Sequence, residues 1–174
     1  MTQQPINQDT INAAVWSACD TFRGTVDPSI YKDYVLTMLF LKYISDVWQD
    51  HYEVYAREHG DHPELITELL KNERFVLPPS ANFYALHAAR HQPGNGERID
   101  KALHAIEETN LAKLRDVFQD ISFNSTKLGD EAQKNDILRH LLEDFARPEL
   151  NLRPSRIGLL DVIGNAYEFL IKNF

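Results

Sequence analysis

Residues 27–58 decide the fold, and they read DPSIYKDYVLTMLFLKYISDVWQDHYEVYARE. The stretch opens with an aspartate and a proline, residue types preferred at the N-cap and the first position of a helix. Apolar side chains then recur every three or four residues for about seven turns, on Tyr31, Val35, Met38, Leu41, Ile44, Trp48, Tyr52 and Tyr55. A second stripe covers much of the opposite side, on Leu36, Phe40, Tyr43 and Val47. A helix that is apolar on two sides is usually buried between neighbours, so we expect residues 29–58 to be the central helix of a bundle.

Shorter segments on both sides of this helix have the same periodicity. Asn7 or Asp9 can cap a first helix that runs to about Phe22. Further helices are predicted around residues 65–70, 84–91, 99–106, 111–121, 137–145 and 160–174, with residues 75–80 extended and residues 92–96 in a loop. No run of five or more residues alternates at period two. The prediction is an all-α bundle of about seven helices around one long central helix, with little or no sheet.

The length of 174 residues fits one domain, and we predict a single helical domain over residues 1–174. The last apolar stripe is still in phase at Phe174, with no capping glycine and no polar tail. We therefore expect a chain cut at a domain boundary, the alternative being a helix that ends uncapped.

The charge of the chain limits its partners. Its net charge is −8, whereas a protein that grips DNA over most of its surface needs the opposite sign. Residues 81–174 are the less acidic half, and so the better candidate for a phosphate contact. Cys19 is the single cysteine, which excludes an internal disulfide and fits the cytoplasm. No apolar run approaches the ~20 residues needed to span a membrane, and no signal segment follows Met1.

Familiar catalytic patterns are weak in this sequence. The segment 77–80 reads LPPS and lacks the asparagine of an amino-methyltransferase loop, so it is interpreted as a rigid connector. His87 and His91 have the spacing of two zinc ligands but no supporting glutamate, and a metalloenzyme is a remote alternative. Asp33, Asp46, Asp50 and Glu53 are interpreted as a solvated helix edge, because unpaired carboxylates rarely leave water. Residue by residue, the sequence predicts no catalytic, cofactor-binding or metal-ligating side chain.

The strongest cluster is the segment 147–156, RPELNLRPSR, in which Arg147, Arg153 and Arg156 accompany a single acid. Two prolines favour an extended chain, which can present guanidinium groups to phosphate. In the alternative interpretation, these arginines pair with the acidic first half or bind a partner subunit. Lys127, in the polar segment 124–130, is a weaker candidate of the same kind.

Three stretches resemble a known family. The first is WSACDTFRG at residues 16–24 with DPSIYKDYVL at 27–36 and FLKYISD at 40–46. The second is VFQDISFNSTKLG at residues 117–129, and the third is LRPSRIG at 152–158 with DVIGNAYEFL at 161–170. They resemble the N-terminal domain of the modification (methyltransferase) subunit, HsdM type, of type I restriction–modification systems.

The resemblance implies a helical accessory domain that precedes a catalytic domain apparently absent from this chain. In that family, the catalytic domain binds S-adenosylmethionine and methylates adenine N6. Its partners would be a specificity subunit, a second modification subunit and double-stranded DNA, and restriction subunits can join. Neither catalytic motif of the family is present, so the resemblance implies support for subunit assembly and closure around DNA rather than catalysis. The alternative is a stand-alone helical protein–protein interaction module with no nucleic-acid function, which the paired stripes of the long helix would suit if one of them stayed exposed.

Overall fold

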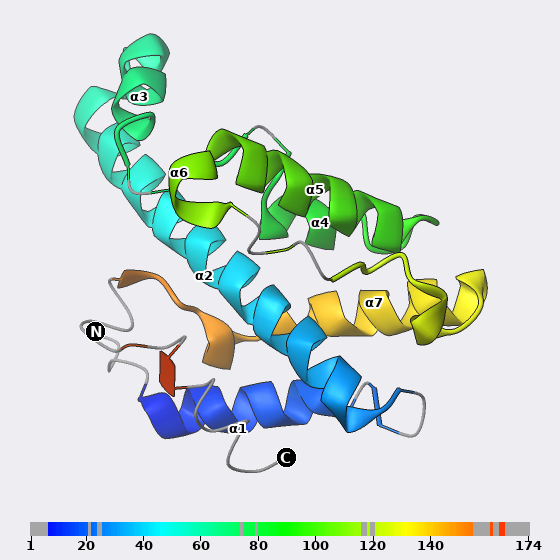
Figure 1. Cartoon of the computed structure of the whole chain (residues 1–174). Coiled ribbons are helices and arrows are strands. Elements are labelled where there is room, and N and C mark those ends of the chain that lie inside the picture. The colour runs from blue at the N-terminus through cyan, green and yellow to red at the C-terminus, as the bar shows by residue number, and fades with distance from the viewer. Residues whose placement is uncertain are drawn as a thin grey trace.

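The computed structural model describes residues 7–20, 22–23, 26–73, 75–78, 80–115, 118, 121–154, 161 and 164–165. Within these ranges the chain forms seven α-helices and two short 3₁₀ helices, with no strand. The predicted all-α bundle is therefore confirmed. Figure 1 shows the other helices arranged along one long helix, α2 (Pro28–His59).

Helix α2 begins where the aspartate–proline pair predicts, and the Asp27 carbonyl accepts hydrogen bonds from the backbone N–H groups of Ile30 and Tyr31. One of its apolar sides, including Val35, Met38 and Ile44, is fully buried. The second stripe is covered as well, because Leu36, Phe40 and Tyr43 are half-buried against the same core. An exposed stripe, which would suit a stand-alone interaction module, is therefore not present in this part of α2.

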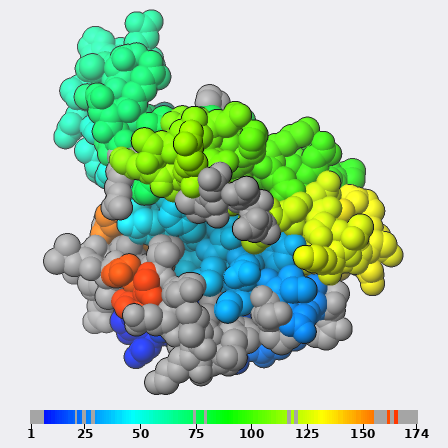
Figure 2. All heavy atoms as spheres, viewed as in Figure 1, coloured from blue at the N-terminus to red at the C-terminus, as the bar shows by residue number. Residues whose placement is uncertain are grey.

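Three helices cover the first two thirds of α2. These are α1 (Gln8–Cys19), α4 (Phe83–Ala88) and α7 (Glu131–Phe145), while α5 (Asn95–Thr109) packs on α4 and α7. The core between them is built around four fully buried phenylalanines, Phe22, Phe83, Phe123 and Phe145. Helix α3 (Pro63–Leu70) packs on the far end of α2, and the pair projects from the body (Figures 1 and 2).

Local capping explains where several helices begin. The Asn7 side chain, one of the two predicted caps, accepts a hydrogen bond of 2.8 Å from the Thr10 N–H. Asp130 caps α7 through a capping box, in which its side chain accepts from the Gln133 N–H and the Gln133 side chain accepts from the Asp130 N–H.

The predicted loop at residues 92–96 is too long, because α5 already begins at Asn95. Gly94 ends the turn in a left-handed conformation with φ of +85°. The Asn95 side chain is buried and donates to the Arg90 and Asn135 carbonyls, which pins the start of the helix. Gly96 lies against the backbone of Phe123, where an added Cβ would stand 2.5 Å from the carbonyl oxygen.

The predicted helix at residues 111–121 is wrong in length. Helix α6 (Leu111–Leu114) is a single turn, Arg115 is extended, and Phe118 and Ile121 are not helical. Phe118 instead packs against Phe40 of α2, with ring centroids 6.0 Å apart. The apolar spacing in residues 111–121 therefore reflects tertiary packing and not a continuous helix. Helix α1 also ends earlier than predicted, at Cys19.

Almost all of the predicted last helix, residues 160–174, lies outside the described residues, as does Arg156. Within the described part of the chain, no helix has the length and the apolar character needed to cross a membrane.

Candidate functional site

The most unusual feature of the core is a buried charge pair on α2. Lys42 is 4% exposed and Asp46 is 0% exposed, and the Lys42 Nζ lies 2.5 Å from Asp46 Oδ2. The pair spans one helical turn, so both side chains lie on the same face of α2. Buried charges are stable only when their polar atoms have partners, which makes the surroundings of this pair decisive.

Two of the partners come from a segment more than a hundred residues further along the chain. Lys42 Nζ donates a hydrogen bond of 2.8 Å to the Leu150 carbonyl, and the Leu152 N–H donates one of 2.8 Å to Asp46 Oδ2. The Tyr84 hydroxyl of α4 donates to the other carboxylate oxygen of Asp46. Lys42, Asp46 and Tyr84 together form what we call the clamp, which fixes the main chain of residues 150–152 on α2.

Burial dominates the electrostatics of the clamp. Desolvation lowers the pKa of Lys42, an effect that the Asp46 carboxylate opposes. Desolvation, followed by the hydrogen bond to Asp46, raises the pKa of Tyr84, so its hydroxyl stays protonated as a donor. Lys42 Nζ also lies 5.5 Å from the ring centroid of Phe83, a cation–π distance. The charged pair is therefore held by four groups from two other parts of the chain, residues 83–84 and residues 150–152.

The interpretation of Asp46 as part of a solvated helix edge is wrong. Asp33 is exposed as expected, but Asp46 is among the least exposed residues of the chain. A signal was present in the sequence, because Lys42 and Asp46 interrupt an apolar face as an oppositely charged pair at i, i+4. The sequence did not indicate that the main chain of residues 150–152 would form hydrogen bonds with this pair.

The arginine segment lies next to the clamp. Residues Pro148–Leu150 form a 3₁₀ helix, η2, and not the extended chain that the prolines predict. Arg153 Nη1 lies 2.7 Å from Glu53 Oε2, and the Arg153 side chain is 26% exposed. Arg147 is exposed, with its Nε 3.6 Å from Glu149. For Arg153, the contact is of the kind the alternative interpretation describes, pairing with the acidic first half.

Lys127 lies apart from these arginines. It is exposed in the 3₁₀ helix η1 (Thr126–Leu128) and forms no ion pair with any residue that the structure describes. Lys127 precedes α7 and Arg147 follows it, so the length of α7, about 22 Å, separates them. Lys127 therefore does not form one patch with Arg147. A contact of Lys127, Arg147 or Arg153 with DNA or a subunit stays a prediction.

The loop that carries Lys127 is held firmly in place. The Asp100 carboxylate of α5 accepts hydrogen bonds from the Ser122 hydroxyl at 2.6 Å and from the Phe123 N–H at 2.7 Å. The Tyr34 hydroxyl of α2 donates to the Ser122 carbonyl at 2.7 Å. The described parts of the three stretches that carry the family resemblance thus meet along α2, one through Tyr34 and another through the clamp.

Two of the remaining candidates, His87 and Cys19, are packed as structural residues, whereas His91 is exposed. His87 stacks on Phe83 at 6.0 Å, and burial followed by the nearby Arg90 lowers its pKa. Burial raises the pKa of the Cys19 thiol from 9.0 to about 12, so the thiol is protonated at neutral pH. No group of three or more His, Cys, Asp or Glu side chains in the described ranges is arranged to hold a metal ion. What the clamp does chemically is hold a segment in position.

Comparisons with known proteins agree with the resemblance in the sequence. A family model described as the HsdM N-terminal domain matches residues 11–145. The type I restriction enzyme MpnII methylase subunit of Mycoplasma pneumoniae is 25% identical over 200 residues, an alignment that covers 94% of this chain and 34% of that protein. A crystal structure of the type I restriction-modification system methyltransferase subunit from Streptococcus thermophilus matches with a TM-score of 0.74 and 23% identity, over 96% of this chain and 38% of that chain.

The structural match shows the fold, and the family match extends from the first to the last of the seven helices. The chain spans about a third of the length of these relatives. Because the matched residues 11–145 make up most of its sequence, this chain belongs to the HsdM N-terminal domain family.

Proposed function

We propose that this chain is the N-terminal accessory domain of a type I restriction–modification DNA methyltransferase subunit. In this proposal the whole subunit transfers a methyl group from S-adenosylmethionine to adenine N6 in the cytoplasm. The chain itself is not catalytic and supports assembly with a specificity subunit, a second modification subunit and, in restriction complexes, a restriction subunit. It also helps close that assembly around double-stranded DNA, whose target base must leave the stack to be methylated.

The observation that carries this proposal is the clamp, together with the family match. The clamp uses a buried charge pair to fix residues 150–152 against the longest helix, although burial removes both charges from water. Such an arrangement suits a rigid body that holds a following domain in a defined orientation. The net charge of −8 supports the accessory role, because a domain that bound DNA autonomously would carry a basic surface.

The test compares three preparations in a methyl-transfer assay with labelled S-adenosylmethionine and double-stranded DNA. They are this chain alone, the whole modification subunit with its specificity subunit, and the same complex with residues 7–154 deleted. We expect transfer by the complete complex, none by this chain alone, and loss of assembly or of transfer on deletion. Nuclease digestion and mass spectrometry of the product identify the methylated base. Transfer by this chain alone, or undiminished transfer after deletion, would refute the accessory role.

The alternative, a stand-alone protein–protein interaction module, is favoured by one observation. Tyr52 and Leu65, at the projecting end of α2 and α3, are 40% and 41% exposed. Sequencing the source DNA beyond the codon for Phe174 separates the two functions. A frame that continues into a Gly-rich methyl-donor loop and an Asn-Pro-Pro-aromatic motif supports the methyltransferase proposal. A stop codon directly after Phe174 supports the interaction module.

A further inference from the structure

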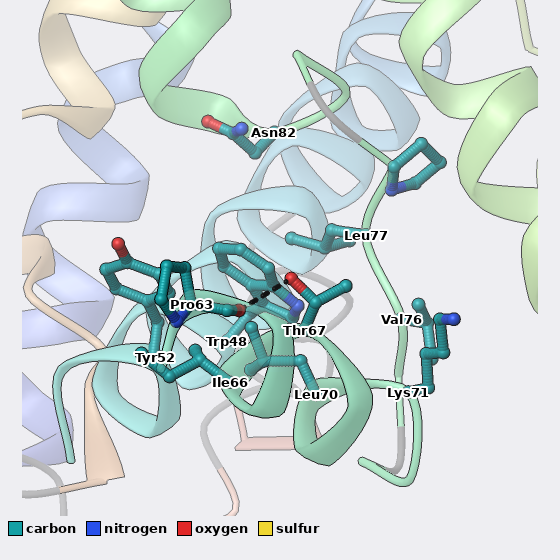
Figure 3. A pocket seen from close by; sticks show the side chains of 11 residues that line it. Trp48, Tyr52, Pro63, Ile66, Thr67, Leu70, Lys71, Val76, Leu77 and Asn82 are labelled. Carbon is teal, nitrogen blue, oxygen red and sulfur yellow. Dashed lines mark hydrogen bonds between the residues drawn. The ribbon is translucent and has the colours of Figure 1, made fainter. Parts of the chain in front are cut away.

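An apolar pocket of about 460 Å³ lies where α3 packs on the far end of α2. Its walls come from three segments: Trp48 and Tyr52 from α2, Ile66 and Leu70 from α3, and Val76 and Leu77 from the chain that follows. Figure 3 shows these side chains gathered around one hollow. The two aromatic rings are stacked, with centroids 5.8 Å apart, and so form a flat apolar wall.

Exposed apolar side chains are also present at this end of the molecule. Four large apolar side chains are exposed in the described part of the chain, and two of them, Tyr52 and Leu65, belong to this region. Tyr52 also lines the pocket. Figure 2 shows that α3 and the end of α2 stand away from the body, so a partner can reach them. An apolar pocket lined by an exposed aromatic side chain marks an interaction surface.

Residues 50–73, which we call the α2–α3 tip, carry a strong negative charge. They contain seven acidic and two basic residues, a net charge of −5 out of −8 for the whole chain. Glu64 and Glu68 are exposed on α3, one turn apart, and each directly follows a pocket-lining residue in the sequence. Two cations offset part of this charge: Lys71, which also lines the pocket, has its Nζ 2.9 Å from Glu68, and Arg153 pairs with Glu53. A positively charged partner therefore fits the tip.

The backbone around the pocket indicates the shape of that partner. The segment that closes the pocket is neither helix nor strand, and at Val76 both backbone groups already have hydrogen-bond partners. The N–H of Val76 donates to Asn110 Oδ1 at 2.8 Å, and its carbonyl accepts from Asn110 Nδ2 at 2.7 Å. An added strand would lack partners at this residue. A hollow between two helices instead suits an amphipathic helix, which presents apolar side chains at i, i+3 and i+4.

The same charge argues against other occupants. A symmetric contact between two copies would bring two tips of net charge −5 together, and a nucleic acid or an anionic membrane would be repelled. We propose that the α2–α3 tip is a docking site for a basic amphipathic helix of a partner protein. One apolar side chain of that helix enters the pocket, and its lysines or arginines face Glu64 and Glu68. The inference goes beyond the proposed function and does not depend on methyl transfer.

The experiment measures binding of two designed peptides to the 174-residue chain by isothermal titration calorimetry. Both are amphipathic helices of about 18 residues, or five turns, with leucine on one face. One carries lysine on the polar face and the other carries glutamate. We expect the lysine peptide to bind at least about tenfold more tightly than the glutamate peptide, and its affinity to fall as salt is raised, because exposed charges are screened.

Two pairs of variants locate the binding surface. Thr67→Phe fills the pocket from α3, and Thr109→Phe is its control, because both threonines are exposed and donate to a carbonyl four residues earlier. Glu64→Lys with Glu68→Lys reverses the charge at the tip. Glu97→Lys with Glu108→Lys makes the same change on exposed residues of α5. Circular dichroism confirms that each variant is folded.

We expect Thr67→Phe to weaken binding of the lysine peptide at least about tenfold and the tip charge reversal to weaken it about fivefold, with both controls changing it less than about twofold. Equal weakening by the test and control variants would overturn the proposal, since the peptide would then respond to net charge alone. Tighter binding of the glutamate peptide would also overturn it. Dimerisation of the chain that Thr67→Phe abolishes would assign the pocket to a second copy instead.

Discussion

Replacing Lys42 with methionine tests whether the clamp holds the domain together. Methionine keeps most of the volume of the lysine stem but removes its charge and its bond to the Leu150 carbonyl. Asp46 would stay 0% exposed with hydrogen bonds from Tyr84 and the Leu152 N–H but no counter-charge. Removing one partner of a buried pair costs about 3–5 kcal/mol. Because Asp46 keeps two donors, we expect the lower end, a loss of about 3 kcal/mol in the free energy of unfolding.

Urea unfolding followed by far-UV circular dichroism measures this loss directly. For a chain of this length, 1 kcal/mol corresponds to about 2–4 °C, so the same variant should melt about 6–12 °C lower. The matched control is Lys101→Met, which removes an exposed lysine from another i, i+4 pair, Glu97 and Lys101, whose Nζ–Oε1 distance is 3.0 Å. We expect that control to cost less than about 1 kcal/mol, since exposed pairs contribute little.

A double-mutant cycle identifies the source of the effect. Asp46→Asn removes the counter-charge while keeping a group that can accept from Leu152. If the pair acts as a unit, Lys42→Met with Asp46→Asn costs less than the sum of the two single changes, by about 1–3 kcal/mol. A loss for Lys42→Met no larger than for Lys101→Met, or strict additivity in the cycle, would refute the argument that this pair anchors residues 150–152.

Further predictions concern three residues: Gly96, Cys19 and Asp130. Gly96→Ala should destabilise the domain by about 1–3 kcal/mol in urea unfolding, because its Cβ would meet the Phe123 carbonyl, and an unchanged stability would contradict that contact. Cys19, with its pKa raised to about 12, should react with a thiol reagent at pH 8 about a thousandfold more slowly in the folded than in the unfolded chain. Because the pKa of the Cys19 thiol is higher in the folded than in the unfolded chain, its contribution to the free energy of unfolding is complete below pH 9 and is lost as the pH rises toward 12. The wild type should therefore lose more stability than Cys19→Ala between pH 9 and pH 12. Parallel plots of unfolding free energy against pH for the two proteins would refute this. Asp130→Ala should cost about 1 kcal/mol by removing the capping box with Gln133, whereas Asp130→Asn should cost less.

The long helix shows how well local sequence patterns predict the ends of a helix. Its start at Pro28 and its end at His59 agree with the predicted range 29–58 within one residue. The reason is that the aspartate–proline start and the three- and four-residue spacing act on the backbone within a few residues. The cap at Asn7 and the all-α class followed from signals of the same kind. The apolar spacing from Leu111 to Ile121 misled, because side chains in an irregular segment can reach the same core.

The candidate site followed much less from the sequence. Arg153 was identified as a notable cation, but its pairing with Glu53 depends on the path of a segment a hundred residues away. Gly96 looked like a loop residue, and its actual role is to let α5 approach the Phe123 backbone closely. The pocket at the α2–α3 tip likewise appears only when three separate segments come together.

What the sequence by itself determined is the all-α class, the long helix at the centre of the bundle, the acidic character and the family resemblance. Each of these depends on residue type and on spacing along a single stretch of chain. The tertiary structure alone decided that Asp46 is buried, because its place in the core requires Lys42, the Tyr84 hydroxyl and the Leu152 N–H at once. Whether a carboxylate stays in water depends on partners that the fold supplies, and those partners come from three separate parts of the chain.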